Sequence, residues 1–525
     1  MSDPQDENET EKETETDWAD LPHPIFNWLS ITGIALLSCS LAAVVFFLLI
    51  GLAHTDESSY AFLTIVPPIL LGVLGAAMII AGFLRERWRH KRRRHSSFLE
   101  RIVVDPLDFV RGTGSIVIVA TLALGTMALL GAGAGSLAAI EYTESNDFCG
   151  NVCHAVMNPE ASVYQQSPHA RIKCVECHVG STTEGYIRAK IGGLRQLWAV
   201  TTGEISRPIP TPIRGRRPSR EMCESCHTSD RMIGYKALER TYFPSGKETD
   251  PVTLRMIVKV GGGGADGLIP GEGIHYHMLA ERKVEYIARD PQSQDIALIR
   301  VTSADGEVKE FSNQDKPLTD DERKSLEMHK IECVDCHSRP AHRFTSPATS
   351  VNAAIAAGKI PSTLPRIKEA SVRALDGGYS TTEQALAEIG PRLKSFYEEQ
   401  DPELLDGNPK QLEPIASVLQ EIYQRTIFPE MKADWRAHPD NIGHRDSPGC
   451  FRCHNDVMVD AEGTPIFTDC SRCHAIIAQG NKVIQTTAEF EKGRSFIHPK
   501  NSKSFNDEFT LCTDCHTGGA EVYDE

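Results

Sequence analysis

Long uncharged apolar stretches are confined to the first 140 residues of the chain, and polar residues are spread throughout the remainder. A helix needs about 20 consecutive apolar residues to cross a bilayer. Three stretches exceed that length, and each can satisfy its backbone polar groups internally as a helix. They span Ile25–Ala53, Tyr60–Leu84 and Gly112–Ile140, so the pattern predicts three N-terminal transmembrane helices.

A strand-like pattern appears in the middle of the chain. β-branched residues alternate with others over Val252–Val260 and Lys283–Phe311. Within the second of these stretches, Asp305-Gly306 is typical of a hairpin turn. The pattern predicts a small β-rich insert, which carries His275 and His277.

Helical periodicity follows the strand-like region. Thr381 and Gln384 resemble a capping box at the start of a helix. The apolar positions after it have helical spacing in two groups. They are Leu386, Ile389, Leu393 and Phe396 in the first group, and Ile415, Val418, Leu419, Ile422 and Tyr423 in the second.

Charged residues set the expected orientation of the membrane part. The second connection, residues 85–111, is rich in arginine and lysine, whereas the first connection has neither. Basic loops remain in the cytoplasm, so everything after Ile140 is expected on the periplasmic side of a bacterial cytoplasmic (inner) membrane. The acidic residues 1–24 are then a disordered cytoplasmic tail. The net charge of −16 argues against a nucleic-acid partner, which is the alternative interpretation of the basic run.

Cysteine usage divides the chain at the same point. Of the 15 cysteines, Cys39 lies in an apolar stretch, where a small buried side chain is expected. The others follow residue 140 in close pairs, and a histidine comes directly after the second cysteine of each pair. Three residues separate the first pair and two separate each of the others: Cys149/Cys153-His154, Cys174/Cys177-His178, Cys223/Cys226-His227, Cys333/Cys336-His337, Cys450/Cys453-His454, Cys470/Cys473-His474 and Cys512/Cys515-His516.

The spacing of these motifs has a chemical reason. Two thiols on one short turn reach the two vinyl groups at one edge of a porphyrin, and the adjacent histidine projects over the ring toward the iron. The C-x-x-C-H pattern is typical of c-type haem attachment, so the repeats predict seven covalently bound haems. Zinc ribbons and thioredoxin-like thiol motifs are the alternatives, but neither accounts for a histidine after every pair.

Low-spin electron-transfer haems need a second axial ligand on each iron. The side chains available outside the motifs outnumber the irons, which favours electron transfer over catalysis at an open iron. These candidate distal ligands are Met157, His169, His275, His277, His329, His342, His438, His444 and His498. Two other functions stay open, namely reduction of a small oxyanion such as nitrite and storage of electrons.

These features give a plan for the domains. The membrane anchor occupies residues 25–140, a three-haem region 141–228, the β-rich insert 229–320 and a four-haem C-terminal region 321–525. The expected fold class is mainly α with much irregular structure: three N-terminal transmembrane helices followed by a multihaem cytochrome c domain with a small β insert. The core of such a domain is partly cofactor.

The segment between the third apolar stretch and the third motif resembles the NapC/NirT family of membrane-anchored quinol dehydrogenases. The resemblance rests on an ordered run of short motifs. They are Phe148-Cys149…Cys153-His154-Ala-Val-Met157-Asn-Pro-Glu160, Ser167-Pro168-His169-Ala-Arg171, Cys174…Cys177-His178, Ala189-Lys190-Ile-Gly192, Gln196-Leu-Trp198 and Arg207-Pro-Ile-Pro-Thr-Pro212.

The resemblance implies a quinol:cytochrome c oxidoreductase that takes electrons from the membrane quinol pool. Its donor would be menaquinol, oxidised at the first haem, and its acceptors periplasmic multihaem c-type cytochromes of anaerobic or extracellular respiration. A family lysine near the quinone matches Lys190, whereas Gln196 stands roughly where the family has an acidic residue, and Arg195 is a further candidate. By the same resemblance, Met157 would ligate the first iron in place of His154. His169 matches a distal-ligand position.

Overall fold

The fold, a computed structural model, divides into two compact units that are described separately here. Unit 1 contains residues 1–144 and 181–183, and unit 2 contains residues 145–180 and 184–525. The acidic tail, the basic loop beyond Arg93 and Cys153 lie outside the described residues. The structure describes residues 27–53, 61–93, 113–152, 154–180, 182–211, 219–228, 232, 234–246, 250–261, 273–278, 282–407, 410–467, 469–480, 485–486, 493–498 and 511–524.

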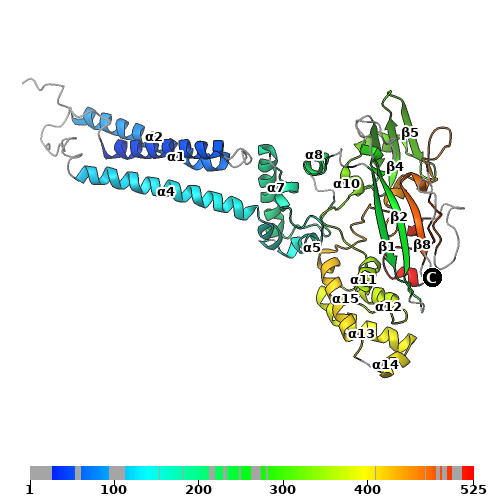
Figure 1. The fold of residues 1–525 in the computed structure, drawn as a ribbon. Helices are drawn as coiled ribbons and strands as arrows, with labels where there is room; N and C mark the ends of the chain where they lie inside the picture. Colours follow the sequence, from blue (N-terminus) through cyan, green and yellow to red (C-terminus); the bar gives the residue numbers. More distant parts are fainter. Residues whose placement is uncertain are drawn as a thin grey trace, which may run out of the picture. The chain divides into compact units, whose positions relative to one another are not determined.

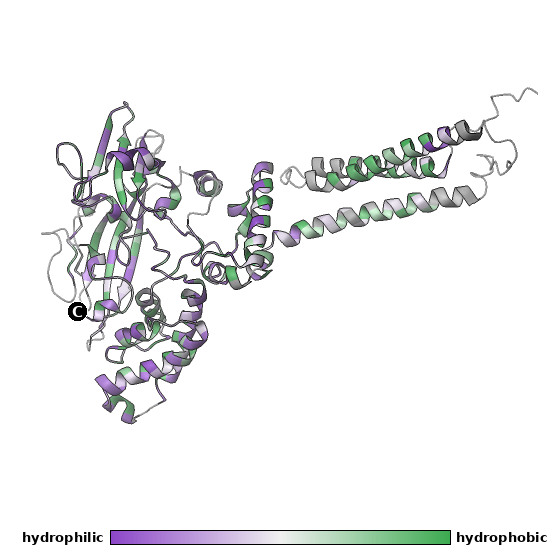
Figure 2. Ribbon diagram, turned by 180° about the vertical axis from the view of Figure 1, so that it is seen from behind, coloured by the Kyte–Doolittle hydropathy of each residue, from purple (hydrophilic) through white to green (hydrophobic). Residues whose placement is uncertain are grey.

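Unit 1 contains one long helix for each predicted apolar stretch. Two of the described stretches, Pro68–Trp88 and Ala120–Thr143, are long and apolar enough to cross a membrane, and a third, Trp28–Val44, is apolar but shorter. Figure 2 shows hydrophobic residues along all three helices. The helices are α1 (Trp28–Ala53), α2 (Ala61–Arg93) and α4 (Thr113–Thr143).

Helices α1 and α2 pack closely because small residues face each other where the helices cross. A Cβ atom on Gly33 would lie 2.6 Å from the carbonyl oxygen of Gly75, and a Cβ atom on Gly75 would lie 2.8 Å from the carbonyl oxygen of Gly33. The Ser40 hydroxyl donates a hydrogen bond of 2.6 Å to the carbonyl of Pro68. Such close approach of small residues is the usual way in which apolar helices associate in lipid.

Unit 2 begins with short helical segments that surround the first three cysteine motifs. The longest of them, α7, is a continuous helix of 20 residues. The segments are a π-helix (Phe148–Val152), α5 (His154–Tyr164), α6 (Cys174–His178), α7 (Thr183–Thr202) and α8 (Ser219–Glu224). Later short helices are α9 (Asp320–Ser325), α10 (Cys333–Cys336) and the 3₁₀ turns Ile274–Met278, Pro429–Met431, Gly449–Arg452, Cys470–Arg472, Cys512–Asp514 and Glu521–Tyr523.

The expected strands are present, but they belong to two antiparallel sheets and not to one. The first sheet has the order β1-β2-β8-β9 and the second the order β6-β3-β4-β5-β7. The turn at Gly306 joins β4 to β5, and this glycine has a φ of 87°, as a hairpin glycine requires. The strands are β1 (Gly234–Tyr242), β2 (Val252–Gly261), β3 (Lys283–Ala288), β4 (Ile296–Thr302), β5 (Val308–Asn313), β6 (His329–Lys330), β7 (Met458–Val459), β8 (His474–Gly480) and β9 (Gln485–Thr486).

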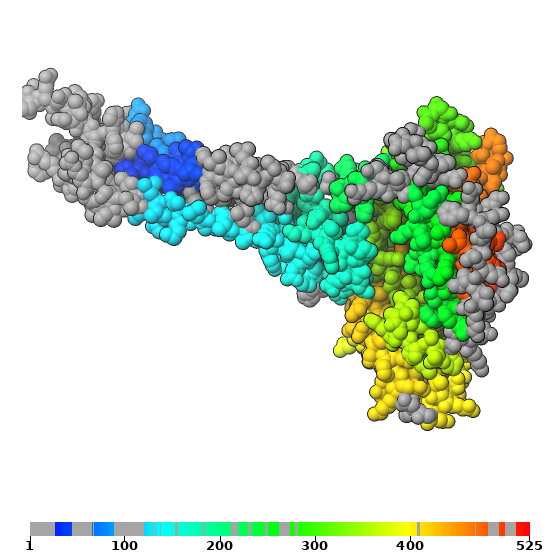
Figure 3. All heavy atoms as spheres, in the orientation of Figure 1, coloured from blue at the N-terminus to red at the C-terminus, as the bar shows by residue number. Residues whose placement is uncertain are grey.

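Both sheets are completed by strands from beyond residue 320. Strand β8 begins at His474, whose Cα pairs with that of Val258 in β2. Strand β6 pairs with β3 just before the fourth motif, and β7 pairs with β5 just after the fifth. In Figure 3 the green atoms of the β1–β5 region and the orange atoms of the β8 region lie side by side. The sheets therefore fix the position of several cysteine motifs.

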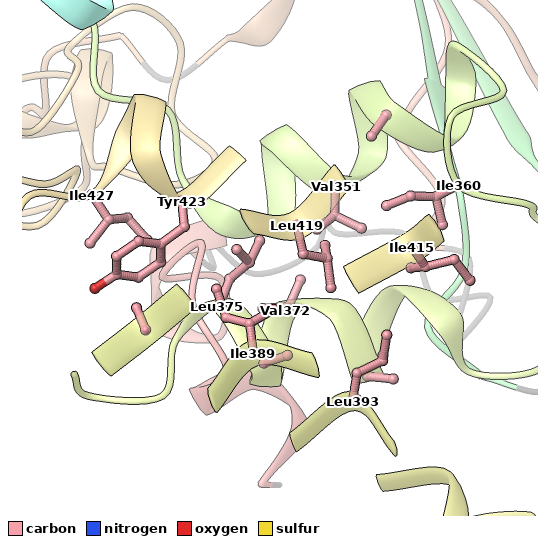
Figure 4. Packing of buried hydrophobic residues seen from close by; sticks show 14 of the residues in the cluster. Val351, Ile360, Val372, Leu375, Ile389, Leu393, Ile415, Leu419, Tyr423 and Ile427 are labelled. Atoms are coloured by element: carbon pink, nitrogen blue, oxygen red, sulfur yellow. The ribbon is translucent and has the colours of Figure 1, made fainter. Parts of the chain in front are cut away.

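A helical subdomain lies between the fourth and fifth motifs and has its own hydrophobic core. Ile389, Leu393 and Leu419 are completely buried in it. Figure 4 shows how these side chains interdigitate with those of neighbouring helices. The subdomain consists of α11 (Pro347–Ala356), α12 (Ile367–Leu375), α13 (Thr382–Gln400), α14 (Glu403–Gly407) and α15 (Glu413–Thr426).

The predicted helix start at Thr381 and the predicted apolar face of α15 are confirmed, whereas the buried face of α13 is formed by Ala385, Ile389, Leu393 and Tyr397, with Leu386 and Phe396 half-buried. Thr381 is the N-cap of α13, and its hydroxyl accepts a hydrogen bond of 3.1 Å from the backbone N–H of Gln384. The Gln384 side chain reaches back to the N–H of Ser380 at 3.0 Å, one residue earlier than a standard capping box requires. The second predicted face forms the buried side of α15, where Ile415 and Tyr423 are both buried.

Candidate metal centres

Most of the cysteine motifs form a single helical turn. In four of them, the backbone N–H of the histidine donates to the carbonyl of the first cysteine. Such a turn brings both cysteines and the histidine to one short stretch of backbone, as attachment to a single cofactor requires. The N···O distances are 2.7 Å for His227–Cys223, 2.8 Å for His337–Cys333, 3.0 Å for His454–Cys450 and 2.8 Å for His516–Cys512.

The irregular first motif has a different local structure. Cys149 lies in the π-helix Phe148–Val152, and His154 is the first residue of α5. A π-helix closes its hydrogen bonds over one residue more than an α-helix. The wider turn therefore accommodates the third intervening residue of this motif. Met157 lies three residues after His154 in the sequence of α5, which is slightly less than one helical turn.

Six of the seven motif histidines face a second histidine from elsewhere in the chain. The centres of the two imidazole rings are 5.8 to 6.3 Å apart in every pair. Two imidazoles on opposite sides of one metal, with metal–nitrogen distances of about 2.0–2.1 Å, have ring centres roughly 6 Å apart. The pairs are His178 with His342, His227 with His169, His337 with His275, His454 with His277, His474 with His444 and His516 with His498.

Backbone carbonyls fix the orientation of many of these rings. A carbonyl oxygen can only accept, so an imidazole Nδ1 that contacts one carries the proton. The lone pair of that ring is then on Nε2 and is available to a metal. The Nδ1···O distances are 3.2 Å from His169 to Pro340, 2.9 Å from His275 to Val260, 3.1 Å from His277 to Ile274, 3.1 Å from His342 to Glu160 and 3.3 Å from His454 to Phe467.

Burial favours the neutral form of these imidazoles. Removal from water disfavours a charged ring, and a metal ligand must be unprotonated. Burial lowers the pKa of His454 to about 4. It is also the main cause of lowered pKa values at His277, His337, His342, His444, His474 and His516.

Two of the candidate distal histidines do not face a motif histidine within the described part of the chain. His329 is exposed on β6 and contacts the ring of Tyr286. His438 is only 2% exposed and stacks on Phe344. Its Nδ1 lies 3.2 Å from a guanidinium nitrogen of Arg339, which can only donate, so the proton of neutral His438 is on Nε2. The proton is therefore on the other ring nitrogen from that in the five paired histidines whose Nδ1 contacts a carbonyl.

An ion pair that the sequence did not predict holds one of the paired histidines in place. Arg339 donates two hydrogen bonds to the carboxylate of Glu160, at 2.8 and 2.7 Å, and its Nε donates to the carbonyl of His342. The carbonyl of Glu160 in turn accepts from Nδ1 of His342. Glu160 follows closely after Met157 and Arg339 after His337, but sequence proximity to a motif does not reveal such a contact.

One large cavity connects most of the paired histidines. It has a volume of about 3690 Å³, whereas a pocket for one small ligand occupies about 300–1,000 Å³. Its lining includes cysteines or histidines from the second to the seventh motif. The donor set, the ring spacing and the cavity therefore fit several porphyrin-sized cofactors. Within the described residues, no group of three or more His, Cys, Asp or Glu side chains is arranged to hold a bare metal ion, as a zinc site would require.

Consecutive motifs adjoin one another in the order of the chain. A hydrogen bond from the thiol of Cys174 to Cys149 raises the pKa of Cys174, and one from Cys223 lowers the pKa of Cys333 to about 7. Electrostatic interactions link further cysteines of successive motifs, and these interactions raise the cysteine pKa values less than burial does. These pairs are Cys177 with Cys226, Cys336 with Cys450 and Cys450 with Cys473.

The three residues of the candidate quinol site lie on α7, but the helix separates them. Lys190 is exposed, and its ammonium lies 4.9 Å from the ring centre of Tyr186. Arg195 and Gln196 follow five and six residues later, and they project from other faces of the helix, which has 3.6 residues per turn. Leu197, which is 57% exposed, shares the face of Lys190. The helix therefore does not bring Gln196 or Arg195 beside the lysine.

Comparison with known proteins agrees with these features. Residues 112–209 match the family described as the NapC/NirT cytochrome c family, N-terminal region. The chain is 34% identical over 503 residues to the cytochrome c-type protein ImcH of Geobacter sulfurreducens, and the match covers 95% of this chain and 96% of that protein. No solved structure matches the chain. With this coverage and identity, the chain belongs to the NapC/NirT family of c-type cytochromes.

Proposed function

We propose that this chain is a three-pass inner-membrane cytochrome that oxidises menaquinol and relays electrons through seven haems to periplasmic multihaem cytochromes. Membership of the family makes it a membrane-anchored multihaem cytochrome of electron transfer. The observation that carries the proposal is the set of six histidine pairs with ring centres about 6 Å apart.

Each haem would be held by the two cysteines of one motif, and its iron by the histidine that follows them. Haem c would supply reversible one-electron exchange at each site. At six sites the distal ligand would be the paired histidine, which leaves no open face for a small oxyanion. His329 and His438 would not be ligands. At the first site, Met157 or His154 would ligate the iron, and both belong to α5.

The residues that would bind adjacent haems support a relay in chain order. Cysteines of successive motifs interact from the first motif to the sixth. Short distances between sites allow electrons to pass one at a time, while a quinol releases two electrons and two protons. A row of sites that begins at the first motif can accept the two electrons of a quinol one after the other.

Quinol oxidation is assigned to the first haem and to α7, which carries Lys190. An exposed ammonium can hold the oxygen of a quinol and favour loss of its proton. Tyr186, one turn earlier on the same face, contacts the lysine and would limit its freedom to move. Gln196 and Arg195 are assigned no direct contact with Lys190, because α7 turns them to other faces.

The proposed topology follows from charge. The basic end of α2 and the loop after it would lie in the cytoplasm, with the acidic tail on the same side. Unit 2 would then lie in the periplasm, where c-type haems are attached.

One experiment tests the proposal directly. Mass spectrometry of the purified full-length protein is expected to give the mass of the polypeptide with seven thioether-linked haems, and spectra of the oxidised protein are expected to be predominantly low-spin. Free thiols or bound zinc at the motif cysteines would disprove the proposal. A predominantly high-spin spectrum would disprove the assignment of the histidine pairs.

A further inference from the structure

Lys368 is a deeply placed cation on α12 that lines the large internal cavity. Its ammonium donates to the carbonyl oxygen of Phe243 at 2.8 Å and, more weakly, to Oδ1 of Asn352 at 3.4 Å. Asn352 is itself fixed, because its amide donates to the carbonyl of Thr241 at 2.7 Å. An ammonium has three hydrogens to donate, so at least one remains for a ligand in the cavity.

The acidic residues close to Lys368 are already engaged with arginines. Asp446 accepts from Arg445, with 2.6 Å between Nε and Oδ1. Glu369 accepts from Arg366 at 2.8 Å and from Arg373 at 3.1 Å. Among the described residues, Lys368 forms no ion pair. Burial of a cation without an anionic partner is costly. Burial and, to a smaller extent, the charge of Arg445 lower the pKa of Lys368 to about 8, although the carboxylate of Asp446 acts in the opposite direction.

This cationic position adjoins the sixth and seventh motifs. Lys368 and Arg445 line the same cavity as Cys512, Cys515 and His516. Both cations help to lower the pKa of His516, after burial and after the nearby His498, so they are close to that ring. Arg445 also directly follows His444, which faces the histidine of the sixth motif.

The C-terminal segment that carries the seventh motif is fixed to the same helices. The carbonyl of Gly518 accepts from the N–H of Ala348 in α11 at 3.0 Å. Arg373 of α12 donates to the carbonyl of Tyr523 at 2.7 Å. Figure 1 shows the red C-terminal turn next to this part of the fold. Lys368 is therefore held in a constant position relative to the seventh motif.

We propose that Lys368, assisted by the charge of Arg445, binds a propionate carboxylate of the haem attached at Cys512 and Cys515. The inference rests on the proposed attachment of a haem to these cysteines. A tethered carboxylate supplies the anion that the ammonium lacks and accepts its remaining hydrogen. The helical subdomain would then serve the last haem as a source of positive charge.

The consequence is a higher reduction potential at one site. A nearby positive charge favours the reduced haem, which has one positive charge fewer than the oxidised form. Removal of the charge in Lys368→Met is expected to shift the one-electron equilibrium of one haem about tenfold toward oxidation, which corresponds to about 59 mV. The other haems are expected to keep their potentials. Lys368→Arg retains the charge and is expected to retain the potential.

The test is a spectroscopic redox titration of the full-length holoprotein in detergent, with haem content measured by mass. Lys359→Met is the matched control, because Lys359 lies in the same subdomain and is exposed. In Lys368→Met, the reduction potential of one haem is expected to be lowered. In Lys359→Met, the potentials of all haems are expected to stay unchanged. Seven attached haems with unchanged potentials would overturn the inference. Should the methionine variant not accumulate, Lys368→Gln removes the charge, keeps a donor for Phe243 and is judged by the same titration.

A second measurement identifies the source of the anion. The titration of the unaltered protein is repeated with increasing inorganic phosphate. A tethered propionate predicts a potential that does not respond to phosphate, whereas a response that is lost in Lys368→Met would show a free-anion site and overturn the propionate assignment. A mass that shows no haem at Cys512 and Cys515 would instead disprove the proposed function at this motif.

Discussion

The Nδ1 atom of His444 lies 3.9 Å from the sulfur of Cys512. His444 faces the histidine of the sixth motif, and Cys512 is the first residue of the seventh. The residues of two successive sites are thus in contact, although the motifs themselves are separated by a long segment. The same close succession of sites is found from the first motif onward.

Loss of one distal histidine should affect a single site. In His277→Ala, the histidine of the fifth motif, His454, loses the ring that faces it at 5.8 Å. One haem in seven is expected to become high-spin while all haems stay attached, as measured by electron paramagnetic resonance and by mass. His329→Ala is the control and should leave the spectrum unchanged. A fully low-spin His277→Ala protein would rule out His277 as a ligand.

Loss of Lys190 should slow quinol oxidation without loss of haem. The ammonium is exposed on α7 beside the ring of Tyr186, and the proposed function places the quinol at this face of the helix. Lys190→Ala is expected to lower the rate of menaquinol oxidation about tenfold or more, equivalent to about 1.4 kcal/mol. Arg188→Ala serves as the control, since Arg188 pairs with Glu184 on the same helix at 2.6 Å. Equal rates in the two variants would exclude Lys190 from the site.

A substitution that creates a cavity in the core of the helical subdomain should destabilise this subdomain strongly. Leu419 is completely buried on α15. Leu419→Ala is expected to lower the free energy of unfolding by about 2–5 kcal/mol, because the neighbouring side chains refill the space only in part. Glu421→Ala, on the exposed side of the same helix, should change it by about 0.5 kcal/mol or less. Urea unfolding followed by circular dichroism measures both, and similar losses in the two variants would contradict the structure.

The ion pair between Glu322 of α9 and Arg289, the residue after β3, should make stability depend on acid pH. Hydrogen bonds from Arg289 and Thr319 lower the pKa of Glu322 to about 2, below its ordinary value of 4.5. The carboxylate therefore stabilises the fold above about pH 4.5, and this contribution is lost as the pH falls toward 2. Glu322→Gln should reduce the change in unfolding midpoint between pH 5 and 3, whereas Glu327→Gln should not. An identical pH profile in Glu322→Gln and the unaltered protein would count against this pair.

Local features of the fold were predictable from the sequence because they depend on neighbouring residues. The N-cap at Thr381, the hairpin turn at Gly306 and the buried face of α15 all follow from short patterns. The cysteine motifs likewise identify their own histidines. Each is a property of a few consecutive residues, and no distant contact is needed to predict it.

The partners of those histidines could not be predicted, because they are contacts between distant segments. The sequence supplied a surplus of candidate ligands, but nothing in it distinguishes His277 from His438. The difference lies in what their Nδ1 atoms contact, a carbonyl in one case and a guanidinium in the other. The sequence likewise predicted one small β-rich insert and not two sheets, because β8 and β6 pair with strands that are far away in the chain.

The pairing of His178 with His342 has a consequence for biogenesis. A chain is made and exported from its N-terminus, so the second site cannot acquire both of its histidines until the segment around residue 342 has emerged. If these two rings ligate one haem, as proposed, a haem attached early at this site would keep one axial position unfilled while much of the polypeptide is still being delivered. A chaperone that shields such half-finished sites would be most needed during this interval, and truncations before residue 342 should yield an immature second site.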